Sequence, residues 1–157
     1  MRAYRIADRR YPIFDGAGAR LAGGRWNSPG RAVIYCEETY AGALLEILVH
    51  ANLGRIPRAH AAVEVTIPGN VAIESAEPDA IPGWDAADQV ASRAFGDEWL
   101  ASNRSAVLLV PSLVARGHEH NILIKPAHSD FSRIRAGVPR EVVWDERLFR
   151  ARSRRRF

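Results

Sequence analysis

The segment Gly23-Gly24-Arg25-Trp26-Asn27 gathers the groups that a loop needs to hold a phosphate-bearing ligand. Its glycines give a flexible backbone, and Arg25, Trp26 and Asn27 add a guanidinium, an aromatic face and an amide. It is not a dinucleotide-binding fingerprint, because no Gly-x-Gly-x-x-Gly or Gly-Lys-Ser/Thr loop is present. A surface turn with Trp26 anchored in the core explains the same residues, so the pattern leaves both interpretations open.

Glu46 and His50 are the second candidate pair. They lie one turn apart on a helix predicted over residues 39–53, whose other positions are largely apolar. The narrow polar face also carries Thr39 and Gly42, which are small enough to let a ligand approach the backbone. This face borders either a pocket or solvent, and the spacing alone does not choose between them.

Ser112 follows an apolar segment and Pro111, at a position where side chains often enter a site. It lacks the Gly-x-Ser-x-Gly context of a hydrolase nucleophile, and a turn serine that bonds its own backbone is the ordinary explanation. Cys36 lies inside an apolar strand and is interpreted as a small buried hydrophobe. The histidines that flank Glu119 do not form a recognisable zinc ligand set.

The elements that position these residues alternate irregularly. The helix at 39–53 is followed by a second helix, predicted from Trp84 to Phe95, with a break at Gly96-Asp97 and a last turn through Trp99. A glycine-rich loop is expected over 15–30. Strands are predicted at 3–6, 31–36, 60–67, 106–110, 121–124 and 141–144. Two helical regions among short strands indicate an α+β domain.

The composition fits one globular domain of 157 residues, with 47% hydrophobic and 25% charged residues. The net charge of +4 comes from five arginines in the last eight residues, and without them it is −1. We therefore expect a domain over 1–149 and a flexible basic tail over 150–157. A single cysteine, no signal peptide and no long apolar stretch predict a cytoplasmic protein without a membrane partner.

Taken together, several motifs resemble the RES domain family, which is named for an arginine, a glutamate and a serine. Here these residues would be Arg25, Glu46 and Ser112, and order and spacing agree from about residue 4 to residue 148. One departure is Lys125, where the family more often has asparagine. The matching motifs are Gly23-Gly24-Arg25-Trp26-Asn27, Val33-Ile34-Tyr35, Ala43-Leu44-Leu45-Glu46, Val110-Pro111-Ser112 and Asn121-x-Leu123-x-x-Pro126-x-His128.

The resemblance implies an ADP-ribosyltransferase-like fold, a split β-core with flanking helices and an NAD⁺ cleft. It further implies a toxin of a bacterial toxin–antitoxin pair that consumes NAD⁺ as its substrate, held inactive by a small helix-turn-helix antitoxin that covers the site. In this interpretation Glu46 stabilises the developing ribose cation, Arg25 binds phosphate or ribose, and Tyr35 stacks on nicotinamide. The remaining assigned residues are Ser112, which orients the reacting end, Trp26 and Asn27, which bind NAD⁺, and His50, Asn121 and His128 in support.

Several alternatives stay open at this point. Water, inorganic phosphate or a protein side chain could accept the ADP-ribose, giving hydrolysis, phosphorolysis or mono-ADP-ribosylation, and depletion of NAD⁺ is preferred. No metal is required, because nicotinamide leaves without one. A non-enzymatic module that binds nucleic acid through its arginine-rich tail ranks below the enzyme, since the rest of the chain is nearly neutral. We also expect a homodimer.

Overall fold

The computed structural model describes residues 1–50 and 58–149, which form a mixed α+β domain. The described helices are α1 (Ala17–Ala22), α2 (Tyr40–His50) and α3 (Val90–Ser102), with short 3₁₀ turns at Pro78–Ala80, Ser129–Arg133 and Glu146–Leu148. The described strands are β1 (Arg2–Asp8), β2 (Ile34–Glu37), β3 (His60–Thr66), β4 (Ile73–Ser75), β5 (Val107–Pro111), β6 (His120–Ile124), β7 (Arg135–Ala136) and β8 (Arg140–Glu141). No helix in the described ranges is long and apolar enough to cross a bilayer.

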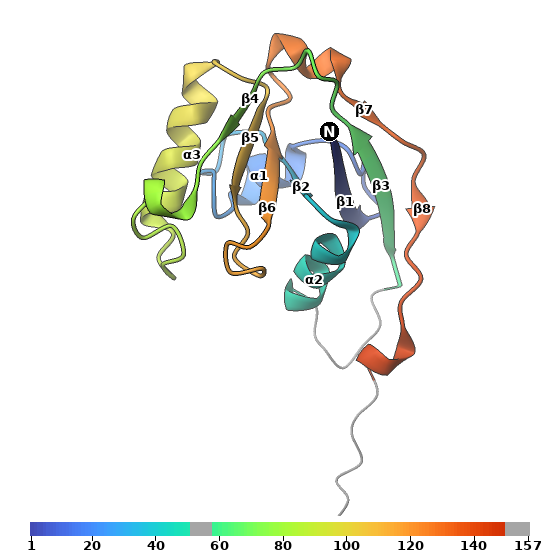
Figure 1. Cartoon of the computed structure of the whole chain (residues 1–157). Helices are drawn as coiled ribbons and strands as arrows, with labels where there is room; N and C mark the ends of the chain where they lie inside the picture. Colours follow the sequence, from blue (N-terminus) through green and yellow to red (C-terminus); the bar gives the residue numbers. More distant parts are fainter. Residues whose placement is uncertain (51–57, 150–157) are drawn as a thin grey trace, which may run out of the picture.

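The strands form one sheet in the order β4-β5-β6-β2-β1-β3-β7, with β8 also paired to β3 (Figure 1). The pairs are antiparallel except for β4 and β5. Strand β1 pairs with β3 along its whole length, from Arg2 to Asp8, but meets β2 only at Tyr4 and Glu37. The sheet is therefore split into two halves that diverge on either side of one residue pair, as the family resemblance implies.

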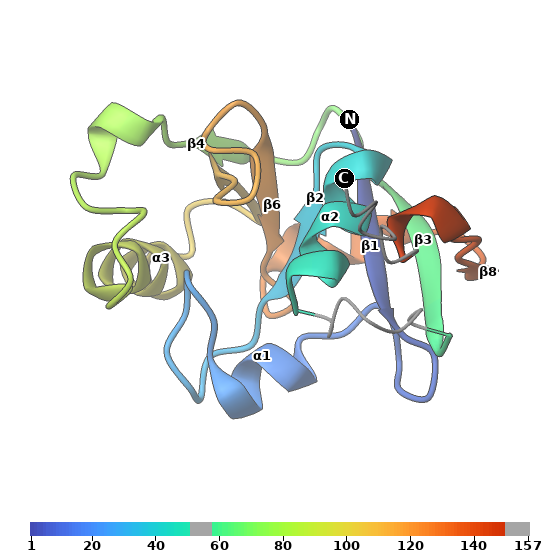
Figure 2. The same ribbon diagram turned by 90° about the horizontal axis from the view of Figure 1, so that it is seen from below.

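Each face of the sheet carries a different layer. One face is covered by residues near the N-terminus and after β6, including Phe14 stacked on Phe131. On the other face, α2 packs against Ile6 and Trp144, and α3 packs through Trp99 against the β5–β6 half. Seen from below, the loop that follows α1 approaches α3 before the chain enters β2 (Figure 2). Helices α2 and α3 thus flank the split from opposite halves.

Most predicted elements are confirmed within a few residues, and four predictions are corrected, the last of them at Gly96. The expected loop at 15–30 contains the short helix α1. Strand character at 141–144 is limited to β8, which ends at Glu141. The helix predicted from Trp84 begins only at Val90, because the residues before it form consecutive turns. Helix α2 is described to His50, and the part of the predicted helix beyond it lies outside the described residues, as does the predicted tail at 150–157.

Gly96 does not break α3, contrary to the sequence-based prediction. It lies inside the continuous helix Val90–Ser102, and it is buried. A Cβ atom at this position would lie well under 3.0 Å from the Trp26 carbonyl oxygen. The glycine is therefore present because the loop backbone touches the helix backbone there, a tertiary contact that sequence periodicity does not reveal.

Alanine should have opposite effects on stability at Gly96, where an added methyl group meets the loop, and at Gly18, where it meets nothing. Gly96→Ala should lower the free energy of unfolding by about 1–3 kcal/mol, because the new methyl group forces the loop away from α3. Gly18→Ala in α1 meets nothing within 4 Å and should stabilise the protein by up to about 1 kcal/mol. Chemical denaturation of both variants measures the difference, and a Gly96→Ala protein at least as stable as wild type would contradict the close contact.

Candidate active site

A pocket of about 670 Å³ opens on the sheet face between α2 and α3. Tyr4, Tyr35 and Glu37 form its floor, and Glu46 reaches it from α2. The opposite wall is the loop at 23–26 together with the first turn of α3. Of the residues predicted from the sequence, the pocket is lined by Arg25, Trp26, Tyr35, Glu46, His50 and Asn121.

Asn27 lies at the centre of the loop and is fully buried. Its Nδ2 donates to the carbonyl oxygens of Ala19, Ser28 and Arg31, at 2.9, 3.1 and 3.0 Å. The Tyr35 hydroxyl donates to Asn27 Oδ1 at 2.7 Å and accepts from the Trp26 amide at 3.1 Å. Asn27 therefore fixes the loop from within and does not line the pocket, and Tyr35 joins the loop to β2.

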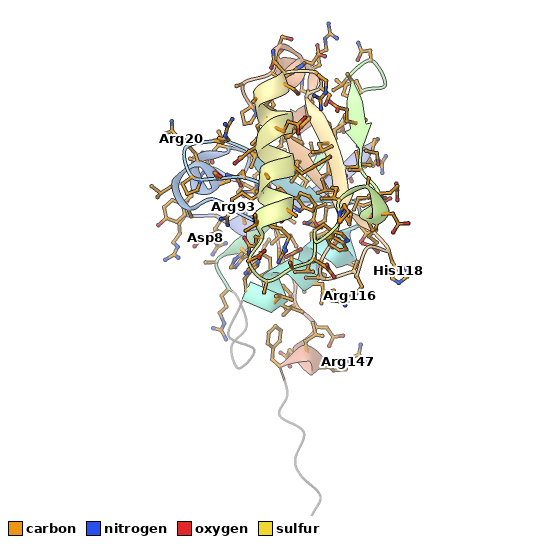
Figure 3. The ribbon with its side chains drawn as sticks, turned by 90° about the vertical axis from the view of Figure 1, so that its left-hand side faces the viewer. Asp8, Arg20, Arg93, Arg116, His118 and Arg147 are labelled. Carbon is orange, nitrogen blue, oxygen red and sulfur yellow. The ribbon has the colours of Figure 1, made fainter. Side chains whose placement is uncertain are left out.

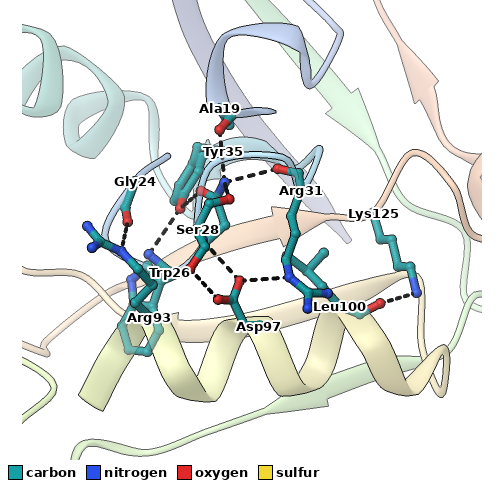
Figure 4. Close-up of polar contacts among 11 residues, drawn as sticks. Ala19, Gly24, Trp26, Ser28, Arg31, Tyr35, Arg93, Asp97, Leu100 and Lys125 are labelled. Atoms are coloured by element: carbon teal, nitrogen blue, oxygen red, sulfur yellow. Dashed lines mark hydrogen bonds and ion pairs between the residues drawn. The ribbon is translucent and has the colours of Figure 1, made fainter. Parts of the chain in front are cut away.

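Helix α3 holds the same loop from outside (Figure 4). Asp97 accepts hydrogen bonds from the backbone amide of Ser28 at 2.9 Å and from its hydroxyl at 2.5 Å. The same carboxylate pairs with Arg31 Nε at 3.4 Å. Arg93 Nε donates to the carbonyl oxygen of Gly24 at 3.3 Å. The loop is thus rigid before any ligand arrives, which is the condition for binding without reorganisation.

Two guanidinium groups enter the pocket at this end. Arg25 Nη1 donates to the carbonyl oxygens of Trp84 and Ala86, both at 3.0 Å. Arg93 Nη2 donates to Gln89 Oε1 at 2.9 Å, and Figure 3 shows Arg93 near the end of α3 at which the helix begins. In the described ranges neither side chain has a carboxylate within 4.0 Å. Both charges therefore remain available to an anionic ligand.

Carboxyl groups gather at the other end of the pocket. Glu46 Oε2 lies 3.6 Å from His50 Nε2, one turn further along α2. Asn121 Nδ2 donates to Glu37 Oε1 at 2.6 Å and lies 3.5 Å from Glu46 Oε1. Burial, with the nearby Glu46 charge, raises the pKa of Glu37 to about 9. Such a pocket accommodates a ligand with an anionic group at one end and a cationic or hydroxyl-bearing group at the other.

Ser112 and His128, two of the predicted residues, do not line the pocket. Ser112 is buried at the end of β5, and its hydroxyl accepts a hydrogen bond from the Ala115 amide at 3.3 Å. The turn that it shapes carries Leu113 and Val114 into the pocket wall. His128 Nδ1 accepts from the Asp130 amide at 3.1 Å and caps the turn at Ser129–Arg133. A direct role for either residue in the site stays a prediction.

Sequence reasoning missed Arg93 and Glu37. Arg93 belongs to no motif, and only the packing of α3 against the loop brings its side chain to the pocket. Glu37 follows the predicted strand 31–36 by one residue, and its alternation with Tyr35 could have placed both on one face. The departure at Lys125 is also explained, because its Nζ donates to Leu100 O at 2.5 Å and to Asn103 Oδ1 at 2.9 Å and so caps α3.

Comparison with known proteins finds relatives over almost the whole chain. The family model described as RES domain matches residues 2–145. A protein from Sphingobium sp. named "Prs ADP-ribosylating toxin" is 44% identical, over 94% of this chain and 96% of its own length. "Toxin Res" from Photorhabdus laumondii is 31% identical, over 96% of this chain and 98% of its own. A chain in the crystal structure of the M. tuberculosis MbcT–MbcA toxin–antitoxin complex has a similar fold, with a TM-score of 0.76 at 17% identity, over 90% of this chain and 83% of that one.

The raised pKa of Glu37 predicts how stability depends on pH. The folded protein keeps the Glu37 proton from the ordinary value of 4.5 up to about 9, so this group makes stability fall as pH rises through that window. Glu37→Gln cannot ionise, so its melting temperature should rise relative to wild type between about pH 5 and about pH 8.5. Glu64→Gln, at a half-exposed position on β3, is the control. A difference between Glu37→Gln and wild type that stays constant with pH would contradict the assignment.

Proposed function

This chain belongs to the RES domain family, and we propose that it is a toxin that binds NAD⁺ and breaks the bond between nicotinamide and ribose. The observation that carries the proposal is the distribution of charge in the pocket. Arg25 and Arg93 stand at one end, and Glu46 with Asn121 stands at the other. NAD⁺ has a matching polarity, because its diphosphate is anionic and its nicotinamide–ribose end is cationic.

Each of these residues has a separate role in the proposed reaction. Arg25 and Arg93 bind the diphosphate through their unpaired N–H groups, and the ring of Tyr35 packs against nicotinamide. Heterolysis leaves the bonding electron pair on nicotinamide, which departs neutral, and a positive charge develops on the ribose. Glu46 stabilises that charge and binds the ribose hydroxyls. Ser112 acts indirectly, through the turn that carries Leu113 into the pocket wall.

We infer that the ADP-ribose acceptor is a side chain of a target protein. The sequence alone favoured depletion of NAD⁺ by water or phosphate, but the name of the Sphingobium relative, at 44% identity, supports transfer to a protein. All three outcomes share the same first step and differ only in what attacks the ribose carbon. Incubation with NAD⁺, with and without inorganic phosphate or cell extract, separates them by product: ADP-ribose, ADP-ribose 1″-phosphate or labelled protein.

We also propose that an antitoxin neutralises this chain by covering the pocket. The fold resembles a chain from a toxin–antitoxin complex, and the names of the curated relatives support a toxin. Val49 lines the pocket and is 61% exposed, and Leu45 beside it is 42% exposed. An apolar rim of this kind suits a protein partner. A helix-turn-helix partner and a homodimer stay predictions.

Glu46→Gln tests the catalytic assignment. The substitution keeps size and hydrogen-bonding capacity but removes the charge, so nicotinamide release should fall by about a hundredfold or more while NAD⁺ still binds. Glu98→Gln, at an exposed position on α3, serves as the matched control. Nicotinamide release is measured beside a thermal melt. A folded Glu46→Gln protein with near-native turnover would remove Glu46 from the reaction.

Arg25→Ala and Arg93→Ala test the phosphate end. Each loses a charge-assisted hydrogen bond worth about 1.5–3 kcal/mol, so each should weaken NAD⁺ binding by about ten- to a hundredfold. Affinity for nicotinamide riboside, which has no phosphate, should stay near that of wild type in both. Lysine should rescue Arg25 only in part, because it lacks the forked donors. The control is Arg20→Ala on α1, and calorimetric titrations in which all three variants bind NAD⁺ equally would refute the assignment.

A further inference from the structure

Glu37 is a buried carboxyl group to which the proposed reaction gives no task. It is the last residue of β2 and is 7% exposed, with its side chain on the pocket floor. Its neighbours in the sheet are Tyr4 on β1 and Asn121 on β6, and both line the same pocket. Glu37 therefore stands where the two halves of the sheet meet, and its side chain faces the same space as Glu46.

One amide group bridges the two carboxyl groups. Asn121 Nδ2 is 2.6 Å from Glu37 Oε1 and 3.5 Å from Glu46 Oε1. A primary amide has two N–H groups on this nitrogen, so it can donate to both carboxyl groups at once. The short bond to Glu37 fixes the plane of the amide, and that plane sets the direction of the N–H group that faces Glu46.

The charges around Glu37 oppose a second negative charge there. Glu46 faces it from α2, and Glu119 faces it from the turn before β6, where its Oε2 accepts from the Thr39 hydroxyl at 2.9 Å. From β1 the facing side chain is the phenol of Tyr4. Burial and these two carboxylates keep the pKa of Glu37 near 9, so the group stays protonated at neutral pH.

We propose that Glu37 is a positioning residue whose carboxyl group holds the Asn121 amide and, through it, directs Glu46 toward the ribose. The inference rests on the proposed function of Glu46. In the protonated state the carbonyl oxygen of Glu37 accepts one amide N–H and leaves the other for Glu46. Ionised Glu37 is a stronger acceptor and repels Glu46, so it draws the amide away from the catalytic carboxylate.

Two substitutions at Glu37 test the inference. Glu37→Leu removes the acceptor and should lower kcat for nicotinamide release by tenfold or more, with KM for NAD⁺ changed by less than about threefold. Glu37→Gln retains a carbonyl oxygen for Asn121 and should restore most of the lost kcat. The wild-type kcat should fall as pH rises through about 9, and the fall should be absent in Glu37→Gln. Glu64→Gln, at a half-exposed position on β3 that does not line the pocket, should follow the wild-type profile.

A readout that needs no turnover separates this inference from the proposed function. In ¹⁵N-labelled protein, the side-chain amide signals of Asn121 should shift with a midpoint near pH 9 in wild type and stay constant in Glu37→Gln. A wild-type protein that releases no nicotinamide would overturn the proposed function while this titration still decides whether Glu37 holds the amide. A folded Glu37→Leu protein with wild-type kcat, an unaltered alkaline fall in Glu37→Gln, or Asn121 signals that ignore pH would each overturn the inference.

Discussion

The structure depends on the narrow connection between the two halves of its sheet. Strand β1 is paired with β3 from end to end, but it meets β2 only where Tyr4 lies opposite Glu37. Beyond this pair the backbone hydrogen bonds end, and the strands separate. The space that opens there has Tyr4, Tyr35 and Glu37 at its floor and forms the pocket. Both residues of the joining pair line that pocket.

A pocket at a split in a sheet needs rigid walls, because the strands beside it do not brace each other. Here the loop at 23–28 is braced by buried Asn27, by the Tyr35 hydroxyl and by Asp97 on α3. The contact between Gly96 and the Trp26 carbonyl brings the helix backbone against the loop. The wall is thus fixed by hydrogen bonds and backbone contact. Among the described residues, the one carboxylate that holds it, Asp97, pairs with Arg31 and leaves Arg25 and Arg93 without an ion pair.

The sequence pattern predicted the helices and strands whose positions depend on interactions between residues close together in the chain. The pattern of apolar residues placed α2 and strands β3, β5 and β6 within a few residues, because each carries either a periodic or a continuous apolar stretch. It failed at Gly96, where a helix contact explains a residue that usually ends helices. The bond from Asn121 to Glu37 joins residues 84 positions apart, and no spacing reveals such a pair. The resemblance to a family identified Arg25 and Glu46, but Arg93 and Glu37 belong to no motif and emerged only from the fold.

Two guanidinium groups lie at one end of the pocket and two carboxyl groups at the other, and most of their hydrogen-bond partners are neutral. Arg25 is held by the carbonyl oxygens of Trp84 and Ala86, and Arg93 by Gly24 and the Gln89 amide. Counter-ions would stabilise these side chains more, but they would also compete with an anionic ligand for the same N–H groups. At the other end, a proton on Glu37 serves the same purpose, because it relieves the repulsion between two neighbouring carboxyl groups. The protein thus forgoes the stability that ion pairs in the pocket would add, and its charged groups stay available to a ligand. This is the pattern expected of a preorganised binding site.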